Sequence, residues 1–219
     1  MRSLKNTEST FAAAAKKKLI DVAKEQNLNI DEVMDSLNSD VKKEDKTKEE
    51  QKDFKEMSPG DLIDHILDTH HIYVKKTLPE LGELSLKILR VHGMNHAELF
   101  RVHKLFAALK ADLEQHLLKE EELLFPLIKE YEAAPSNELL SKIFGVIKEI
   151  EDEHEVAGDV IKELRLITDD FTVPDDGCMS YSMTYKMLEE LESDLFQHIH
   201  LENNILFVDL RQGDGSSDL

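Results

Sequence analysis

Six side chains with metal-binding chemistry occupy positions where a buried apolar residue is expected. They are His71, His116, Glu120, His154, His198 and Glu202. Each interrupts a run of aliphatic residues spaced alternately three and four apart, the pattern of a helix that buries one face. A polar group buried without a partner costs about 1–3 kcal/mol, and an unpaired carboxylate costs far more. We therefore expect something to bind these six groups, and a cation is the simplest candidate.

Four of the six form two His-x-x-x-Glu pairs, which place His116 with Glu120, and His198 with Glu202, on one helix face. The spacing alone is weak evidence, because ten histidines and 46 acids produce roughly two such pairs by chance. The surrounding residues carry the signal. The segments HLLKEEELLF (116–125) and HIHLENNILF (198–207) share the His, the Glu, an aliphatic residue at the eighth position, and the final Leu-Phe. This repeat predicts two matching parts of one site.

The elements that must position these residues are helices. Glycine and proline are scarce, at 8 and 5 residues, and β-branched alternation is absent. Four long helical patterns are separated by breakers at 92–95, 135–137 and 174–177. The expected fold is all-α, an antiparallel up-down-up-down four-helix bundle. Beside the six polar residues, the predicted core positions include Leu67 and Val91 in the first pattern, Leu123 and Leu127 in the second, and Ile205 in the fourth.

The spacing of the four histidines predicts that they lie in a single layer. Residues at one level on successive antiparallel helices are equidistant from the loop between them. The positions midway between successive histidines are at Gly93, Pro135 and Asp176, and all three lie in predicted loops. About 20 residues of helix separate the layer from each loop, a distance of about 30 Å.

Four imidazoles and two carboxylates suit two cations of borderline hardness. Iron fits best, with manganese and zinc as alternatives. We expect each ion to bind two histidines, with Glu120, Glu202 and a solvent-derived oxo or hydroxo group bridging both. This leaves each ion about five-coordinate, with an open position for a small ligand. If the helical register differs by one residue from the one assigned here, His70 rather than His71 is the ligand. The competing interpretation is a structural bundle whose core histidines are satisfied by hydrogen bonds.

Charge and composition restrict the classes of partner. The net charge is −19, from 27 basic and 46 acidic residues. Residues 1–57 hold 12 of these basic and 13 of these acidic residues, so −18 of the −19 falls after residue 57. Such a surface repels phosphate backbones and anionic lipids, so neither nucleic acid nor a membrane is expected as partner. The single cysteine, Cys178, excludes an internal disulfide and indicates a reducing, cytoplasmic location. The sequence leaves the oligomeric state open.

The domain organisation follows from the same patterns. We expect a small helical amino-terminal segment over 1–40, a charged linker over 41–57, the bundle over 58–212, and a disordered tail over 213–219.

These motifs resemble the repair-of-iron-centres family, hemerythrin-like di-iron proteins implicated in restoring iron–sulfur clusters damaged by nitric oxide or oxidants. The resemblance runs from about Asp61 to Phe207. It rests on LIDHIL (62–67), LPEL (78–81), RVH (90–92), HLLKEEELLFP (116–126), EHEVAG (153–158), Cys178 and HIHLENNILF (198–207). It implies a di-iron site whose ligands are the same six residues. The family's amino-terminal Cys-Cys-Gly-Gly motif is absent here, so any role of that cysteine pair does not transfer.

The resemblance implies a stress protein that binds nitric oxide or dioxygen and supports repair of iron–sulfur proteins. Iron donation and reductive removal of nitric oxide both remain open as its activity. One alternative is a hemerythrin-type oxygen-binding or sensing protein, although these typically supply a fifth histidine that we do not find here. A less favoured alternative is a ferritin-like ferroxidase, which would use Glu-x-x-His at Glu151–His154 and leave His116 and His198 idle.

Overall fold

The computed structural model describes residues 54–213, and every regular element in this range is a helix. A 3₁₀ turn, Phe54–Glu56, precedes α3 (Pro59–Ile66) and α4 (Ile72–His92). Next come α5 (Glu98–Lys119), α6 (Phe125–Ala133), α7 (Asn137–Ile167), α8 (Met179–Leu201) and α9 (Phe207–Gly213). Three π-helical segments, Leu67–His71, Glu120–Leu124 and Glu202–Leu206, join α3 to α4, α5 to α6, and α8 to α9. Within this range no helix is both long and apolar enough to cross a bilayer.

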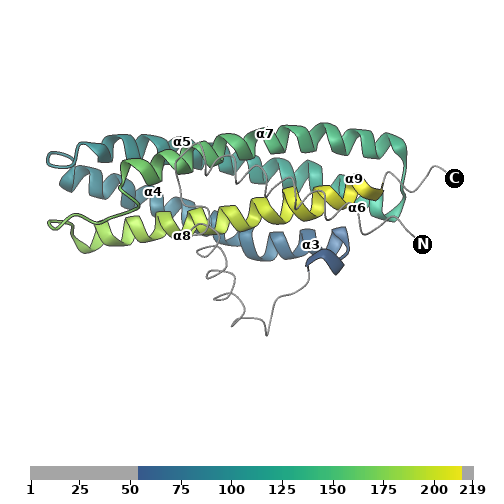
Figure 1. Cartoon of the computed structure of the whole chain (residues 1–219), viewed down its shortest axis with the longest axis horizontal. Helices are drawn as coiled ribbons and strands as arrows, with labels where there is room; N and C mark the ends of the chain where they lie inside the picture. The colour runs from purple at the N-terminus through teal and green to yellow at the C-terminus, as the bar shows by residue number, and fades with distance from the viewer. Residues whose placement is uncertain (1–53, 214–219) are drawn as a thin grey trace, which may run out of the picture. The chain divides into compact units, whose positions relative to one another are not determined.

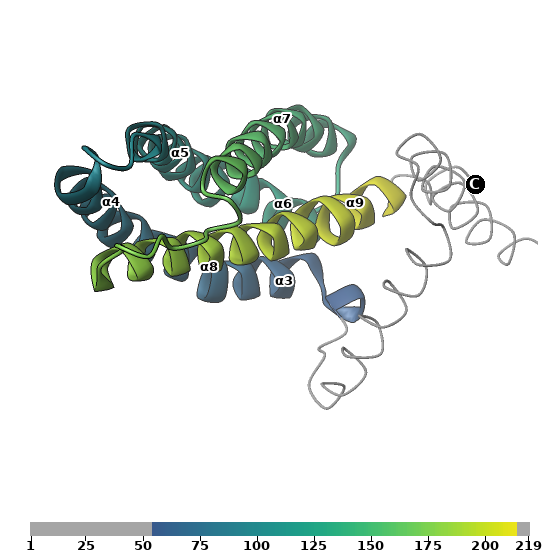
Figure 2. The same ribbon diagram turned by 60° about the vertical axis from the view of Figure 1, so that its left-hand side comes forward.

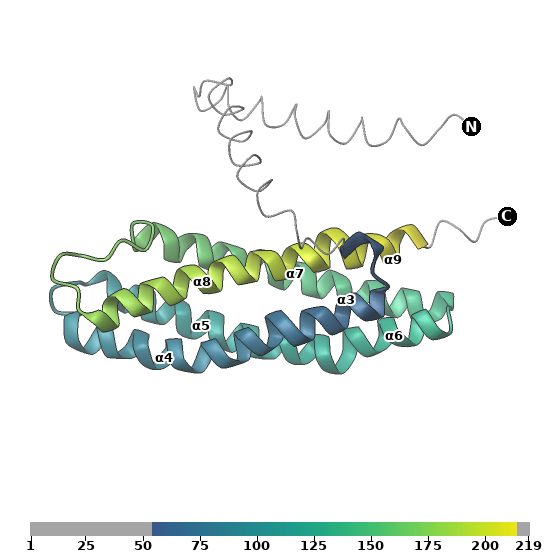
Figure 3. The ribbon, with the colours of Figure 1, turned by 90° about the horizontal axis from the view of Figure 1, so that it is seen from below.

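The helices form the four antiparallel columns of the expected bundle (Figure 1). The columns are α3 with α4, α5 with α6, α7 alone, and α8 with α9. The α4–α5 turn and the α7–α8 loop lie at one end, and the α6–α7 turn lies at the other (Figures 1 and 3). The α4 helix packs against α5 and α8, while α7 packs against α5 and α6. The turned view shows the columns around a common interior (Figure 2). The predicted fold class is confirmed.

Side-chain caps explain where two of the columns begin. The Ser58 hydroxyl accepts a hydrogen bond from the Asp61 backbone N–H at 3.1 Å, and Pro59 occupies the first helical position of α3. The Ser136 hydroxyl accepts from the Leu139 N–H at 3.2 Å at the start of α7. Ser136 lies within the breaker predicted at 135–137, and Ser58 lies at the predicted start of the bundle.

The core is divided into two hydrophobic clusters. One extends toward the α4–α5 turn and includes Val74, Leu113 and Leu195. The other extends toward the α6–α7 turn and includes Ile66, Ile147 and Leu206. The six polar residues of the predicted layer fall between the two clusters along every column. The layer is therefore sealed by apolar side chains above and below.

The π-helical segments correct part of the predicted core. Leu123 was expected inside but is 45% exposed, whereas Leu124 and Phe125 are buried. The reason is that a π turn inserts one residue into the helical repeat, which moves the buried face on by one position. Leu67, Leu127 and Ile205 are only partly buried next to these segments. Val91, at the end of α4, is 63% exposed.

The beginning of the bundle unit lies before the predicted boundary at residue 58. Phe54 and Met57 pack against the second hydrophobic cluster, and the Phe54 ring lies 4.9 Å from that of His65. The compact unit that contains the bundle starts at Phe54. The segment expected over 1–40, most of the linker and nearly all of the predicted tail lie outside the described residues.

Candidate metal centre

The six predicted ligands meet in two groups that share both carboxylates. His71 and His198 form one group with Glu120 and Glu202, and His116 and His154 form the other with the same two glutamates. Within each group the ligand atoms lie within 4.8 Å of one another. All six residues are buried, and both glutamates have 0% exposure. We call the first the 71/198 group and the second the 116/154 group.

Each carboxylate gives one oxygen to each group. Glu120 Oε1 lies 3.1 Å from His116 Nε2, while its Oε2 lies 3.3 Å from His71 Nε2. Glu202 Oε1 lies 3.1 Å from His198 Nε2, while its Oε2 lies 3.2 Å from His154 Nε2. Two carboxylates placed in this way could bridge a pair of cations.

The groups contain polar atoms that the protein itself does not satisfy. Both oxygens of Glu120, both oxygens of Glu202, and the Nε2 atoms of His71 and His198 are buried without a hydrogen-bond partner among the described residues. Each such atom costs about 1–3 kcal/mol. Six of them converge here, and a pair of divalent cations would satisfy all six. The residues present therefore fit a two-metal site.

Comparison with known proteins agrees with this geometry. Residues 62–210 match the family described as the hemerythrin HHE cation binding domain. A probable iron–sulfur cluster repair protein of Haemophilus influenzae is 36% identical over 190 residues, 86% of this chain and 81% of that protein. The chain belongs to the hemerythrin-like iron–sulfur cluster repair family.

Other relatives extend the similarity to most of the chain. The iron–sulfur cluster repair protein YtfE of Enterobacter is 35% identical over 71% of this chain and 68% of that protein. The YtfE of Dickeya chrysanthemi is 31% identical over 204 residues, 93% of this chain and 87% of that protein. This last match spans 204 of the 219 residues, so it includes part of the chain before residue 54. The chain thus contains a cation-binding domain of this family with two buried His/Glu metal-binding groups.

Three of the columns of this hemerythrin-like bundle carry a π turn at a ligand. His71 ends one π segment, and Glu120 and Glu202 each begin one. A π turn is rare in proteins and is frequent at functional sites, because it redirects a side chain without ending the helix. The periodicity of the sequence does not reveal these turns. The repeated Glu-x-x-x-Leu-Phe segment marks two of them, since the π turns occupy matching positions in both copies.

Outer hydrogen bonds orient three of the four imidazoles. The Nδ1 atom of His71 lies 2.7 Å from Glu121 Oε1, that of His116 lies 2.8 Å from Glu153 Oε2, and that of His154 lies 3.0 Å from Asn203 Oδ1. An acceptor at Nδ1 fixes the tautomer that leaves Nε2 free for a metal. Glu121, Glu153 and Asn203 lie off the apolar pattern, so sequence reasoning missed them. Each directly adjoins a predicted ligand in the chain, which is the one signal that points to them.

The two shared carboxylates shift the pKa values of histidines around them. Burial by itself lowers the pKa of His116, but the charge and close contact of Glu120, the charge of Glu202 and the hydrogen bond to Glu153 outweigh it and raise that pKa to about 9. Likewise, burial disfavours the charged form of His198, yet Glu202 and Glu120 raise its pKa. Burial raises the pKa of Glu202, but His198 and His154 hold it well below its usual value. The two buried carboxylates therefore favour positive charge in this layer.

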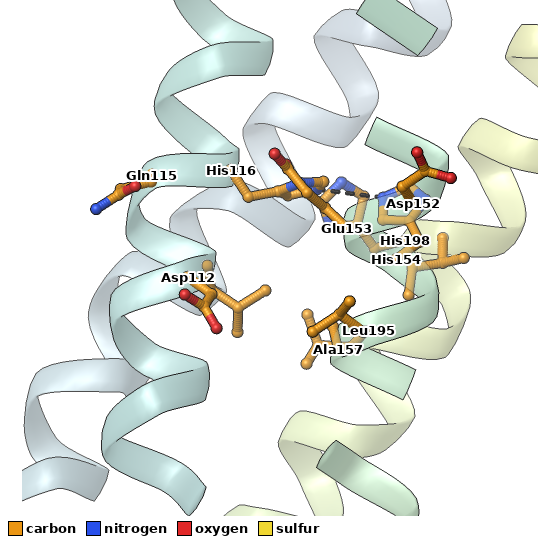
Figure 4. Close-up of a pocket in the computed structure, with 12 residues that line it drawn as sticks. Asp112, Gln115, His116, Asp152, Glu153, His154, Ala157, Leu195 and His198 are labelled. Carbon is orange, nitrogen blue, oxygen red and sulfur yellow. Dashed lines mark hydrogen bonds and ion pairs between the residues drawn. The ribbon is translucent and has the colours of Figure 1, made fainter. Parts of the chain in front are cut away.

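A cavity of about 310 Å³ reaches the layer between α5, α7 and α8. His116, His154 and His198 contribute to its lining, and Leu113, Ala157 and Leu195 form apolar walls. Figure 4 shows the three imidazoles grouped beside the open space, with Asp112 and Gln115 on the same helix as His116. The cavity therefore connects the metal-binding groups, and the 116/154 group most directly, with a space large enough for a small ligand.

The structure places His70 and Glu151, the residues that the two alternative ligand sets would add, outside both groups. His70 belongs to neither group, since its Nδ1 faces Asp194 Oδ1 at 2.8 Å. Glu151, which a ferroxidase-type site would use, binds Arg211 at 2.8 Å instead. The ferroxidase alternative also left His116 and His198 idle, and both belong to the observed groups. The geometry therefore favours the six predicted residues over a ferroxidase-type set.

The remaining histidines are engaged elsewhere. His103 Nδ1 lies 3.0 Å from the Ser85 hydroxyl, and His200 Nδ1 lies 3.0 Å from the Asn204 amide. At the loop end of the bundle, His92 Nε2 lies 3.2 Å from the Cys178 sulfur, and this contact lowers the pKa of the exposed thiol to about 7. In the part of the chain that the structure describes, this end contributes no further group of three metal-binding side chains.

Proposed function

We propose that the protein is a non-haem di-iron protein that supports the repair of iron–sulfur clusters damaged by nitric oxide or oxidative stress. The ligands that we propose are His71, His116, Glu120, His154, His198 and Glu202. The observation that carries the proposal is the pair of buried His₂Glu₂ groups that share both carboxylates. Relatives that cover most of the chain are named iron–sulfur cluster repair proteins, which supports the physiological role.

The donor set favours iron. Four imidazole nitrogens and two carboxylates form a mixed set that suits iron, manganese or zinc rather than the oxygen-only set preferred by magnesium or calcium. Two bound iron ions would supply redox chemistry and open positions for nitric oxide or dioxygen. The protein's own residues would hold the imidazoles in the correct tautomer, through Glu121, Glu153 and Asn203. The two hydrophobic clusters would limit access of water.

The partners that we propose are small ligands and damaged iron–sulfur proteins. The cavity beside His116 and His154 has apolar walls, which suit a small uncharged ligand such as nitric oxide or dioxygen. The net charge of −19 disfavours nucleic acid and anionic lipid surfaces. A reducing compartment, the cytoplasm, agrees with the single cysteine and its free thiol.

The test combines metal analysis with exposure to gases. Protein expressed with ample iron is expected to contain close to two iron ions per chain by mass spectrometry. The anaerobically reduced protein is expected to bind nitric oxide. Dioxygen should oxidise it without stable, reversible binding, as followed by visible spectroscopy during purging with inert gas. One zinc ion per chain, or no metal, would overturn the di-iron proposal. Repeated lossless return to the reduced state would favour an oxygen carrier.

A truncation tests which part of the chain the centre requires. Deletion of residues 1–53 is expected to leave the iron content unchanged, because all six proposed ligands lie within the described unit. Deletion of residues 1–57 also removes Phe54 and Met57, which pack on the bundle. Losing about 2 kcal/mol of apolar burial should lower its melting temperature by about 4–8 °C relative to the shorter deletion. Calorimetry and metal analysis of both variants measure these effects, and loss of iron in the 1–53 deletion would contradict the expectation.

A further inference from the structure

His70 is buried beside the metal-binding groups without belonging to either. Its side chain is 8% exposed, and the π segment Leu67–His71 directs both His70 and His71 into the bundle. The His70 ring lies parallel to that of His198, with 5.6 Å between centroids and 5° between planes. The ring of His71 contacts His198 edge-on at 5.0 Å. His198 is therefore held by one imidazole against its face and another at its edge.

Asp194 holds His70 in this place. It lies four residues before His198 on α8, so both side chains are on the same helix face. Its Oδ1 atom lies 2.8 Å from His70 Nδ1, and its Oδ2 atom is buried without a hydrogen-bond partner among the described residues. A largely buried carboxylate is costly unless it is hydrogen-bonded, so the contact with His70 offsets much of this cost. The two residues therefore form a fixed pair behind His198.

The 116/154 group has a different environment. His116 and His154 are 5% and 6% exposed, whereas His71 and His198 are both 1% exposed. Both His116 and His154 line the cavity, whereas only His198 of the 71/198 group does. The side chain of Glu153, the Nδ1 partner of His116, is 38% exposed, against 24% for Glu121, the partner of His71. A cation held by this group is separated from solvent by less protein than a cation held by the 71/198 group.

We propose that the protein holds its two cations unequally, with His70 and Asp194 as positioning residues that retain the cation of the 71/198 group while that of the 116/154 group exchanges first. This inference rests on the proposed two-metal centre. Release of a cation requires its imidazole ligands to rotate away. His198 cannot rotate without displacing the stacked His70 ring, which is itself held by Asp194. His116 and His154 can rotate toward the cavity. The iron available to an acceptor is therefore the one held by His116 and His154.

The test follows the release of cobalt(II) from the full chain. Protein loaded with two cobalt ions is mixed with excess chelator, and loss of the visible cobalt absorption is recorded. Two phases of equal amplitude are expected. His70→Ala and Asp194→Ala should accelerate the slow phase about tenfold or more, the size typical of changes in the outer shell of a metal site, and leave the fast phase unchanged. Glu153→Ala, which removes the acceptor of His116 on the other group, is the matched control and should accelerate only the fast phase.

Conservative variants separate positioning from a general loss of stability. Asp194→Asn keeps an acceptor for His70, and His70→Phe keeps a stacked ring, so both should restore most of the slow phase. Equal acceleration of both phases by His70→Ala or Asp194→Ala would overturn the inference. So would a slow phase that neither alanine variant changes. Release of both ions in a single phase would overturn it too, while leaving the two-metal centre intact. Binding of fewer than two cobalt ions would instead overturn the proposed centre itself.

Discussion

Glu120→Gln and Glu202→Gln are each expected to prevent binding of both metal ions. Each carboxylate gives one oxygen to the 71/198 group and the other to the 116/154 group, so one substitution damages both. Loss of an outer hydrogen bond at a metal site already costs about 10–100-fold in affinity, so loss of a bridging ligand should cost more than ~100-fold. Glutamine preserves the side-chain volume, so the bundle should still fold. Metal content per chain after dialysis measures the effect.

Three further variants test whether loss of both ions is specific to the two shared carboxylates. Glu122→Gln and Glu155→Gln change acids on the exposed face of the same helical columns and should retain both ions. His71→Ala removes a ligand of one group only and should retain about one ion. If Glu122→Gln lost metal as completely as Glu120→Gln, the assignment of the bridging carboxylates would be wrong.

Removal of the metal ions is expected to lower the melting temperature by about 15 °C or more. Each ion that binds only the folded state adds about 4 kcal/mol when its free concentration is about 1,000 times its dissociation constant. A chain of this size loses about 2–4 °C per kcal/mol. The loss should be large here because the carboxylates are fully buried and have only imidazoles near their oxygens. Calorimetry of the loaded protein and of protein stripped by a chelator measures the difference.

The bridging-ligand variant is the control for this measurement. Glu202→Gln protein should melt at the same temperature with and without chelator, because it has no ions to lose. A chelator-dependent shift in that variant would show that the chelator acts on the protein by another route. An unchanged melting temperature on stripping the unsubstituted protein would mean that the ions contribute little to its folding.

Much of the site could be predicted from helical periodicity. His71, His116, His154 and His198 each interrupt an apolar face, and their distances from three loops place them at one level. The structure places all four in one layer between two hydrophobic clusters, and both groups share Glu120 and Glu202. This succeeded because an antiparallel bundle has one dominant geometric rule, the rise of 1.5 Å per residue from each turn.

Apart from Val91 at the end of α4, the predicted core failed at the π turns. Leu123 is exposed and Leu124 is buried because a π turn begins at Glu120. A periodicity argument assumes one repeat along the whole helix, whereas a π turn changes the repeat locally. The energy that maintains such a turn comes from contacts with the other helices. It is therefore invisible in the pattern of a single column.

The sequence by itself determined the bundle, the layer and the identity of the residues in it. Helix periodicity and loop positions are local properties, and burial of six polar groups at one level requires a common partner. Only the tertiary structure decided which oxygen of each glutamate faces which pair of histidines. Likewise, it alone showed that Glu121, Glu153 and Asn203 orient imidazoles on other helices, and that His70 stacks on His198. These contacts depend on the rotation of each helix about its axis and on side-chain rotamers, which are set by packing between columns rather than by spacing within one.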